Sequence, residues 1–274
     1  SYRFSNYWND NRFHFVKGDV TQPISVDTPF DYIIHAASNA SPNFFKEKPV
    51  EVMKSNITGV ELLLEYGLAH GLRRMVFVST GEVYGEGNGT PFKEHDSGYV
   101  DCTNPRSCYP SSKRAAETLC ASYVAEYDAD IVIARPCHTY GPYFTESDNR
   151  VYAQFIRNVL SGQDIVMKSK GELFRSWVYV VDCALAILLL LVKGERGAAY
   201  NIASNESNVT IRQLAELTAG VAGRKVVMEL AESGVTPPVT KAVFSTERLE
   251  ALGWKPLTSL QTGITHTLKT MEGA

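Results

Sequence analysis

A tyrosine and a lysine stand four residues apart at Tyr109 and Lys113, within the run Ser-Cys-Tyr-Pro-Ser-Ser-Lys. This spacing places both side chains on one face of a helix. An ammonium group beside a phenol favours the phenolate, so Lys113 is expected to lower the pKa of Tyr109. Tyr109 is therefore a candidate general acid or base at neutral pH. The alternative is an ordinary surface pair, because both residue types are common on exposed helices.

More polar side chains follow a short apolar run, Met75 to Val78, which is typical of a strand buried in a parallel sheet. They are Ser79, Thr80 and Glu82. Ligands of open α/β sheets bind just beyond the carboxyl ends of such strands. We therefore expect Thr80 and Glu82 to lie at a ligand site. The alternative for Glu82 is a solvated charge on a loop.

Composition and charge exclude several classes of protein. The chain has 274 residues and a formal net charge of −3, which gives no basic signal for nucleic acid. Its five cysteines are odd in number and show no Cys-x-x-Cys pairing, so neither a disulfide framework nor a metal site is predicted. The longest aliphatic run, 184–192, is too short to span a bilayer and predicts a buried helix. We expect a reduced cytoplasmic protein with no membrane or nucleic-acid partner.

Apolar runs and their periods predict the main elements. Strands are expected at 13–16, 30–35, 74–78, 130–134 and 199–202, and a short one at 165–168. Helices are expected at 50–69, from 107 onward, at 151–160, within 178–192 and at 209–222. The segment 41–49 is polar and holds two prolines, so it is expected to be a loop, as is the stretch 86–101, which is rich in glycine and acidic residues.

Seven stretches of the chain, taken together and in this order, resemble the extended short-chain dehydrogenase/reductase family of nucleotide-sugar epimerases, dehydratases and decarboxylases. They are Gly18–Val20, Asp31–Ser38, Asn56–Gly59, Val78–Gly85, Tyr109–Lys113, Arg135–Pro142 and Arg175–Asp182. The resemblance implies an α/β fold, a Rossmann-like doubly wound parallel sheet with a smaller C-terminal α/β lobe. Residues 1–142 and 176–204 would form the dinucleotide-binding domain, and residues 143–175 and 205–274 would bind the nucleotide sugar.

The chain departs from the family pattern near its start, where no Gly-x-x-Gly-x-x-Gly occurs. Family members begin with a strand, that glycine-rich turn, a helix and a second strand, and the turn holds the pyrophosphate of the dinucleotide at a helix N-terminus. We therefore expect this first strand–helix–strand unit to be missing. Binding of the dinucleotide by the chain as given is expected to be poor or absent, and the sites below are assigned to the intact parent.

The resemblance implies NAD as the cofactor, with NADP left open. Asp19 would border the adenine, although its sequence context fits a turn cap equally well. Small residues after the strand that ends at His35 would let the cofactor pass the backbone, with tight packing as the alternative. Asn56 would tie neighbouring strand ends together. The predicted cofactor contacts are Asp19, Val20, Ala36, Ala37, Ser38, Asn56, Val78, Ser79, Tyr109, Lys113, Arg135, Pro136 and His138.

The resemblance also implies a nucleoside diphosphate sugar as substrate. Arg175 suits bidentate contact with a diphosphate or a carboxylate. Arg150 lies in a segment similar to one of the decarboxylases. His138 stands where most relatives have Asn, and a structural hydrogen bond is its alternative role. The predicted substrate contacts are Thr80, Glu82, His138, Arg150, Val151, Gln154, Lys168, Arg175 and Lys241.

The reaction implied by the resemblance begins with oxidation of the sugar at C4 to a ketone, with Thr80, Glu82, Tyr109 and Lys113 as catalytic residues. The run Thr-Gly-Glu at 80–82 is closer to the Thr-Ser-Glu of UDP-glucuronate decarboxylases and GDP-mannose dehydratases than to the Thr-Asp-Glu of dTDP-glucose 4,6-dehydratases. A UDP-glucuronate decarboxylase-like enzyme is favoured, with a 4,6-dehydratase or a 4-epimerase as alternatives. A non-catalytic binding or scaffold protein is the alternative of another class. The family also implies a homodimer.

Overall fold

The sheet that carries the site consists of four parallel strands. The computed structural model describes the whole chain apart from residues 1, 25, 27, 231–240 and 273–274. The strands are β1 (Tyr32–His35), β2 (Arg74–Val78), β3 (Ile131–Pro136) and β7 (Ala199–Ile202), and they lie in this order across the sheet. The predicted parallel sheet is confirmed, and so are the predicted strands from 74 onward, with shifts of one or two residues at their ends.

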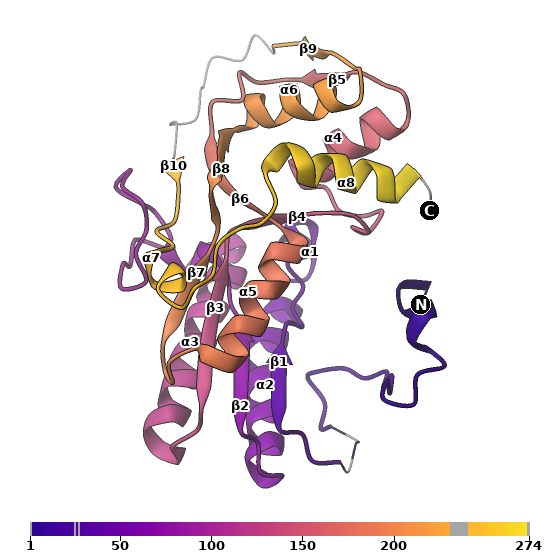
Figure 1. Cartoon of the computed structure of the whole chain (residues 1–274). Helices are drawn as coiled ribbons and strands as arrows, with labels where there is room; N and C mark the ends of the chain where they lie inside the picture. Colours follow the sequence, from indigo (N-terminus) through magenta and orange to yellow (C-terminus); the bar gives the residue numbers. More distant parts are fainter. Residues whose placement is uncertain (1, 25, 27, 231–240, 273–274) are drawn as a thin grey trace.

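Helices cover both faces of this sheet (Figure 1). On one face α2 (Pro49–Ala69) and α3 (Cys108–Tyr127) pack on Met75, Phe77 and Ile131. On the other face α5 (Val180–Lys193) packs on Val76 and Val132. Strand side chains alternate between the two faces, so a strand covered on both sides is apolar throughout, as its sequence indicated.

The other elements form a smaller unit around a second core, called the upper lobe here (Figure 1). Strand β6 (Phe174–Tyr179) pairs with β4 (His138–Tyr140), β8 (Ser204–Thr210) and β10 (Lys241–Ala242), and β5 (Ile165–Met167) pairs with β9 (Val226–Met228). Helices α4 (Val151–Leu160), α6 (Ile211–Val221) and α8 (Leu260–Glu272) pack around the same core. Strand β6 runs across the predicted boundary between residues 175 and 176, and the division into domains stays a prediction.

Five short helical segments complete the described elements. They are α1 (Pro42–Glu47) and α7 (Glu247–Glu250) with the 3₁₀ turns η2 (Gly81–Tyr84) and η3 (Pro105–Ser107), and a further 3₁₀ turn, η1 (Tyr2–Tyr7), opens the chain. The prediction that residues 41–49 form a loop is therefore wrong in part. Pro42 begins a helix of six residues, which a proline permits at the first position, and burial of Phe45 holds it in place.

Two other predictions of local structure are wrong. The run 13–16 forms no described strand, because Phe13 and Phe15 pack instead on the aromatic rings of Phe4 and Trp8. Helix α5 is buried on one face only. Its other face is a stripe of aliphatic side chains that are at least two-fifths exposed, namely Val181, Leu185, Leu188 and Val192. No helix in the described part of the chain combines the length and apolarity that crossing a bilayer requires.

Candidate active site

Two cavities that share part of their walls lie beyond the carboxyl ends of β2 and β3, where the sheet meets the upper lobe. The first has a volume of about 450 Å³ and is lined from β2, β3, the first turn of α3 and the upper lobe. The second has a volume of about 780 Å³ and is also lined by the glycine-rich loop 85–89. Six residues line both cavities: Thr80, Glu82, Pro136, Cys137, His138 and Arg175.

The first cavity contains the phenol and the hydroxyl that the sequence predicted to meet. Tyr109 occupies the first turn of α3 and is 7% exposed, and its phenol lies near enough to the Thr80 side chain for hydrogen bonding to lower the pKa of Tyr109. Thr80 follows β2 directly, and its hydroxyl oxygen also accepts a hydrogen bond of 3.2 Å from the Glu82 backbone N–H. These contacts fix the phenol, the hydroxyl and the start of η2 relative to one another.

The prediction that Lys113 lowers the pKa of Tyr109 is wrong for the protein without ligands. Burial raises the pKa of Tyr109 to about 12, while the Thr80 hydrogen bond, Arg150 and Arg106 act in the opposite direction. The Lys113 ammonium instead donates a 2.8 Å hydrogen bond to the carbonyl of Val78, and burial lowers its pKa to about 8. The spacing indicated that Tyr109 and Lys113 share one face of a helix. It could not indicate that burial dominates the pKa of both groups.

The cavity wall next to Lys113 fits the nicotinamide and ribose end of NAD. Ala36, Ser38 and Ser79 line it, and small side chains there leave the backbone accessible. The Ser79 hydroxyl is buried and has no hydrogen-bond partner among the described residues, which suits a polar ligand group. The predicted roles of these residues and of Lys113 as cofactor contacts stay predictions.

Asn56 links the elements around that wall. It is fully buried in α2, accepts a 2.7 Å hydrogen bond from Ser38 and donates one of 2.9 Å to Ser112 of α3. The tie therefore runs from the end of β1 to helix α3, and not between two neighbouring strand ends as the sequence analysis expected. The cofactor role of Asn56 stays a prediction.

The other predicted cofactor residues differ in position. Asp19, Val20, Ala37 and Arg135 line neither cavity, whereas Val78 lines the first and Pro136 and His138 line both. Asp19 is exposed and accepts hydrogen bonds from the backbone and hydroxyl of Thr21, as a turn cap does. The Arg135 guanidinium makes two hydrogen bonds to Glu117, at 2.6 and 2.9 Å, which supports a structural role.

Three of the predicted substrate residues from the upper lobe line the first cavity, namely Arg150, Val151 and Arg175. The Arg150 guanidinium is held by both carboxylate oxygens of Asp148. Gln154 and Lys168 are exposed and line neither cavity. Lys241 begins β10, and its side chain lies outside the described residues.

His138 lies on the wall that the two cavities share. Its ring centre is 5.1 Å from that of Trp177, and it opens to solvent through the cavity although protein atoms surround it. Enclosure, together with Arg175 and Arg150, lowers the pKa of His138 to about 4, so the imidazole is neutral at pH 7. It can therefore donate or accept a hydrogen bond without adding charge.

Sequence reasoning missed two residues of this cavity. The Phe45 ring stacks on that of Tyr109, with centres 4.6 Å apart and planes at 19°. The Arg106 guanidinium lies 4.6 Å from the centre of the Phe45 ring and pairs with Glu82 at 3.1 Å. Arg106 stands within the Arg-Ser-Cys-Tyr run next to the predicted base, which was a usable signal. Phe45 gave none, because its segment was expected to be a loop.

Position 81, between Thr80 and Glu82, accepts no side chain as the site stands. A β-carbon added to Gly81 would lie 2.5 Å from the Phe244 ring, far inside van der Waals contact. Phe244 is itself buried against Tyr84 and Phe92. The glycine in Thr-Gly-Glu is thus required by the packing of this ring.

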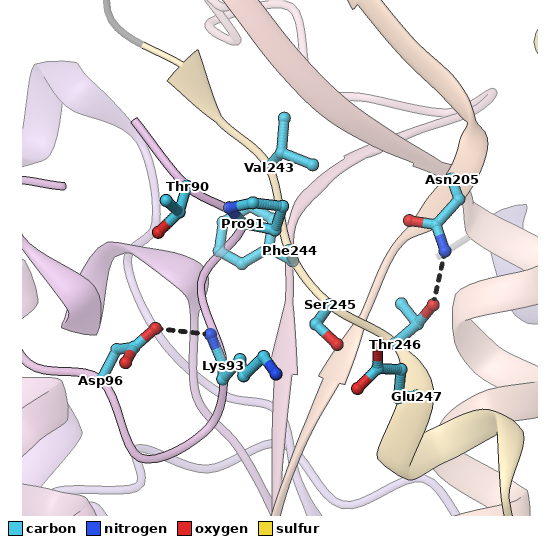
Figure 2. Close-up of a pocket in the computed structure, with 10 residues that line it drawn as sticks. All are labelled: Thr90, Pro91, Lys93, Asp96, Asn205, Val243, Phe244, Ser245, Thr246 and Glu247. Atoms are coloured by element: carbon cyan, nitrogen blue, oxygen red, sulfur yellow. Dashed lines mark hydrogen bonds between the residues drawn. The ribbon is translucent and has the colours of Figure 1, made fainter. Parts of the chain in front are cut away.

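A third cavity, of about 400 Å³, lies on the other side of Phe244, between the loop 90–96 and the segment 243–247 (Figure 2). The Asp96 carboxylate accepts a hydrogen bond from the backbone N–H of Lys93, and Asn205 donates one to the hydroxyl of Thr246. None of the predicted site residues lines it. Within the described ranges no cluster of three His, Cys, Asp or Glu side chains could hold a metal ion.

Comparison with known proteins assigns the family. The sequence model of the NAD dependent epimerase/dehydratase family matches residues 2–203, about three quarters of the chain. The chain belongs to this family. The predicted membership, the Rossmann-like fold and the prediction of an NAD-dependent enzyme are therefore confirmed.

Individual relatives are similar over most of the chain. UDP-glucuronic acid decarboxylase 5 of Arabidopsis thaliana is 34% identical over 254 residues, which are 92% of this chain and 73% of the relative. The solved UDP-glucose 4-epimerase of Thermus thermophilus in complex with NAD is 29% identical, with a TM-score of 0.75 over 90% of this chain and 78% of that one. RMD from Pseudomonas aeruginosa, complexed with NADPH, is 27% identical, with a TM-score of 0.80 over 94% of this chain and 88% of that one.

Proposed function

We propose that this protein decarboxylates UDP-glucuronate with NAD as cofactor. The observation that carries the proposal is the charge of the first cavity. Four cations line it, namely Arg106, Lys113, Arg150 and Arg175, against the single carboxylate of Glu82, in a chain whose formal net charge is −3. A nucleoside diphosphate sugar with a carboxylate at C6 is the kind of anion that such a wall attracts. Similarity to UDP-glucuronic acid decarboxylases over 92% of the chain supports the same substrate.

The first step is oxidation of the sugar at C4. NAD, when bound, supplies the acceptor for the hydride that leaves C4. Tyr109 accepts the proton of the C4 hydroxyl as a phenolate. Burial and Glu82 oppose that phenolate in the protein without ligands, whereas Thr80, Arg150 and Arg106 favour it. Thr80 then polarises the new C4 carbonyl.

The second step breaks the bond between C5 and C6. This bond is β to the C4 carbonyl, so its electron pair can move into an enolate as carbon dioxide leaves. Arg175 and Arg150, which line the part of the cavity that the upper lobe supplies, hold the anionic groups of the substrate. A proton from solvent must then be added at C5, and we assign its relay to Glu82, which lines both cavities. Return of the hydride to C4, with Tyr109 giving its proton back to the C4 oxygen, completes a UDP-pentose, so that the net change is the loss of one carbon dioxide.

Two features argue against the alternative reactions. The dTDP-glucose 4,6-dehydratases of this family carry an aspartate between the threonine and the glutamate, and this chain has Gly81 there. Plain 4-epimerases usually have a small neutral residue where Glu82 stands. Decarboxylation needs neither the missing acid nor a neutral residue at position 82.

Mass spectrometry of the products tests the proposal. The chain is incubated with excess NAD and either UDP-glucuronate or UDP-glucose, with Tyr109→Phe as the inactive control. The expected result is loss of one carbon dioxide from UDP-glucuronate alone. Loss of water from UDP-glucose, or a new epimer of unchanged mass, would replace decarboxylation by one of the alternatives. Calorimetric binding of both NAD and UDP-glucuronate with no turnover would favour the non-catalytic binding protein.

A further inference from the structure

We propose that Arg106 determines specificity at this site, because by neutralising Glu82 it lets the cavity accept a sugar that carries a carboxylate. The inference rests on the proposed function and names a residue to which the sequence gave no role. The starting point is a repulsion between like charges in the cavity. A hexuronate brings its own carboxylate to a wall that already contains that of Glu82, and two like charges at close range disfavour binding.

The position of Arg106 is fixed from three sides. The Asn104 side chain accepts a 2.9 Å hydrogen bond from the Arg106 backbone N–H and so caps η3. The guanidinium lies over the Phe45 ring at 4.6 Å. One of its nitrogens, Nη2, reaches both carboxylate oxygens of Glu82, at 3.1 and 3.4 Å. Arg106 is therefore held close to Glu82 before any substrate arrives.

Other cations of the cavity are engaged elsewhere. Arg150 is bound to Asp148, and Lys113 donates to the backbone of β2. Among the described residues, the ion pair of Glu82 is the one with Arg106. Both partners are more than a third exposed, at 39% and 51%, so the pair adds little to the stability of the free protein. The ion pair matters in the complex, because the bound sugar displaces water from around Glu82 and the charges of the pair are then screened less.

The test measures binding of two ligands that differ at C6, UDP-glucuronate and UDP-glucose, by calorimetry with the chain saturated with NAD. Variants are Arg106→Gln, Arg106→Lys and the double variant Arg106→Gln with Glu82→Gln. Arg73→Gln is the matched control, because Arg73 also pairs with a carboxylate, Asp31, and lies over a tyrosine ring, but outside the cavities. Melting temperatures show whether each variant is folded.

Arg106→Gln is expected to weaken the binding of UDP-glucuronate about tenfold and the binding of UDP-glucose less than about threefold. Arg106→Lys keeps the charge and should stay within about threefold of wild type for both. The double variant should regain most of the lost UDP-glucuronate affinity, because the unpaired carboxylate is gone.

Equal losses for the two ligands in Arg106→Gln, or no recovery in the double variant, would overturn the inference and leave Arg106 as a support for Phe45. If wild type binds neither ligand, the proposed function fails and this inference falls with it. If wild type binds UDP-glucuronate and Arg106→Gln binds it as well, only the inference about Arg106 fails.

Discussion

Replacement of Thr80 by valine removes one hydroxyl from the site and keeps the shape of the side chain. In the structure this hydroxyl lies beside the Tyr109 phenol, where it favours the phenolate, and it accepts a hydrogen bond from the backbone N–H of Glu82. A hydrogen bond to a charged group contributes about 1.5–3 kcal/mol, and the phenolate is such a group. Since each 1.36 kcal/mol is a factor of ten in rate, kcat for UDP-glucuronate should fall about 10- to 150-fold.

The same substitution should move the pH profile in a known direction. The Thr80 hydrogen bond lowers the pKa of Tyr109 against the larger effect of burial, so its loss raises that pKa further. The phenolate then forms only at higher pH, and the rising limb of kcat shifts to the alkaline side. Release of carbon dioxide is measured at saturating NAD and UDP-glucuronate across the pH range.

Thr80→Ser is the matched control, because it keeps the hydroxyl and should retain most of the activity. An unchanged kcat with an unmoved pH limb in Thr80→Val would refute the reasoning about the phenol. A loss that appears in KM alone would mean that Thr80 contacts only the ground state.

Three further substitutions test the structure around the site. Gly81→Ala should lower the free energy of unfolding by about 1–3 kcal/mol, because its β-carbon meets Phe244, and Phe244→Leu should restore part of the loss. Burial lowers the pKa of Lys113 to about 8 from 10.5. Between pH 8 and pH 10.5 the unfolded chain binds more protons than the folded chain, so the free energy of unfolding rises with pH. Urea titrations at pH 8 and 10 should show that Lys113→Met loses this rise. Glu117→Gln leaves Arg135 without its buried carboxylate and should lower the free energy of unfolding by about 3 kcal/mol, measured with urea.

Each of these has a control of the same chemical type. Gly220→Ala adds a β-carbon in α6 where nothing lies within 4 Å, so it should cost nothing. Lys54→Met and Glu126→Gln make the matching changes at exposed helix positions. If the buried and the exposed member of any pair behave alike, the contact described for the buried residue does not govern stability.

The fold was largely predictable because its central strands β2 and β3 are buried on both faces. The run Met75 to Val78 is apolar throughout for that reason, and the helices 50–69 and 151–160 show their periods clearly. The site residues Thr80 and Glu82 were predictable from topology, since parallel strands end at one edge of the sheet.

Three-dimensional contacts account for what sequence reasoning missed. Helix α1 has six residues, too few to be stable alone, and it exists because Phe45 packs on Tyr109. The spacing of Tyr109 and Lys113 identified the pair, but burial decides the pKa values of both side chains. How deeply each side chain is buried cannot be read from a spacing of four residues. Helix α5 is aliphatic all round, so its sequence did not distinguish the covered face from the exposed one.

The fate of C5 tests the central claim most directly. UDP-glucuronate is converted in D₂O with NAD, and the product is examined by NMR, with wild type beside Tyr109→Phe. We predict carbon dioxide and a UDP-pentose that carries one deuterium at C5 from wild type, and no product from Tyr109→Phe. A six-carbon product from wild type, or the same pentose from Tyr109→Phe, would contradict decarboxylation that begins at the Tyr109 phenol.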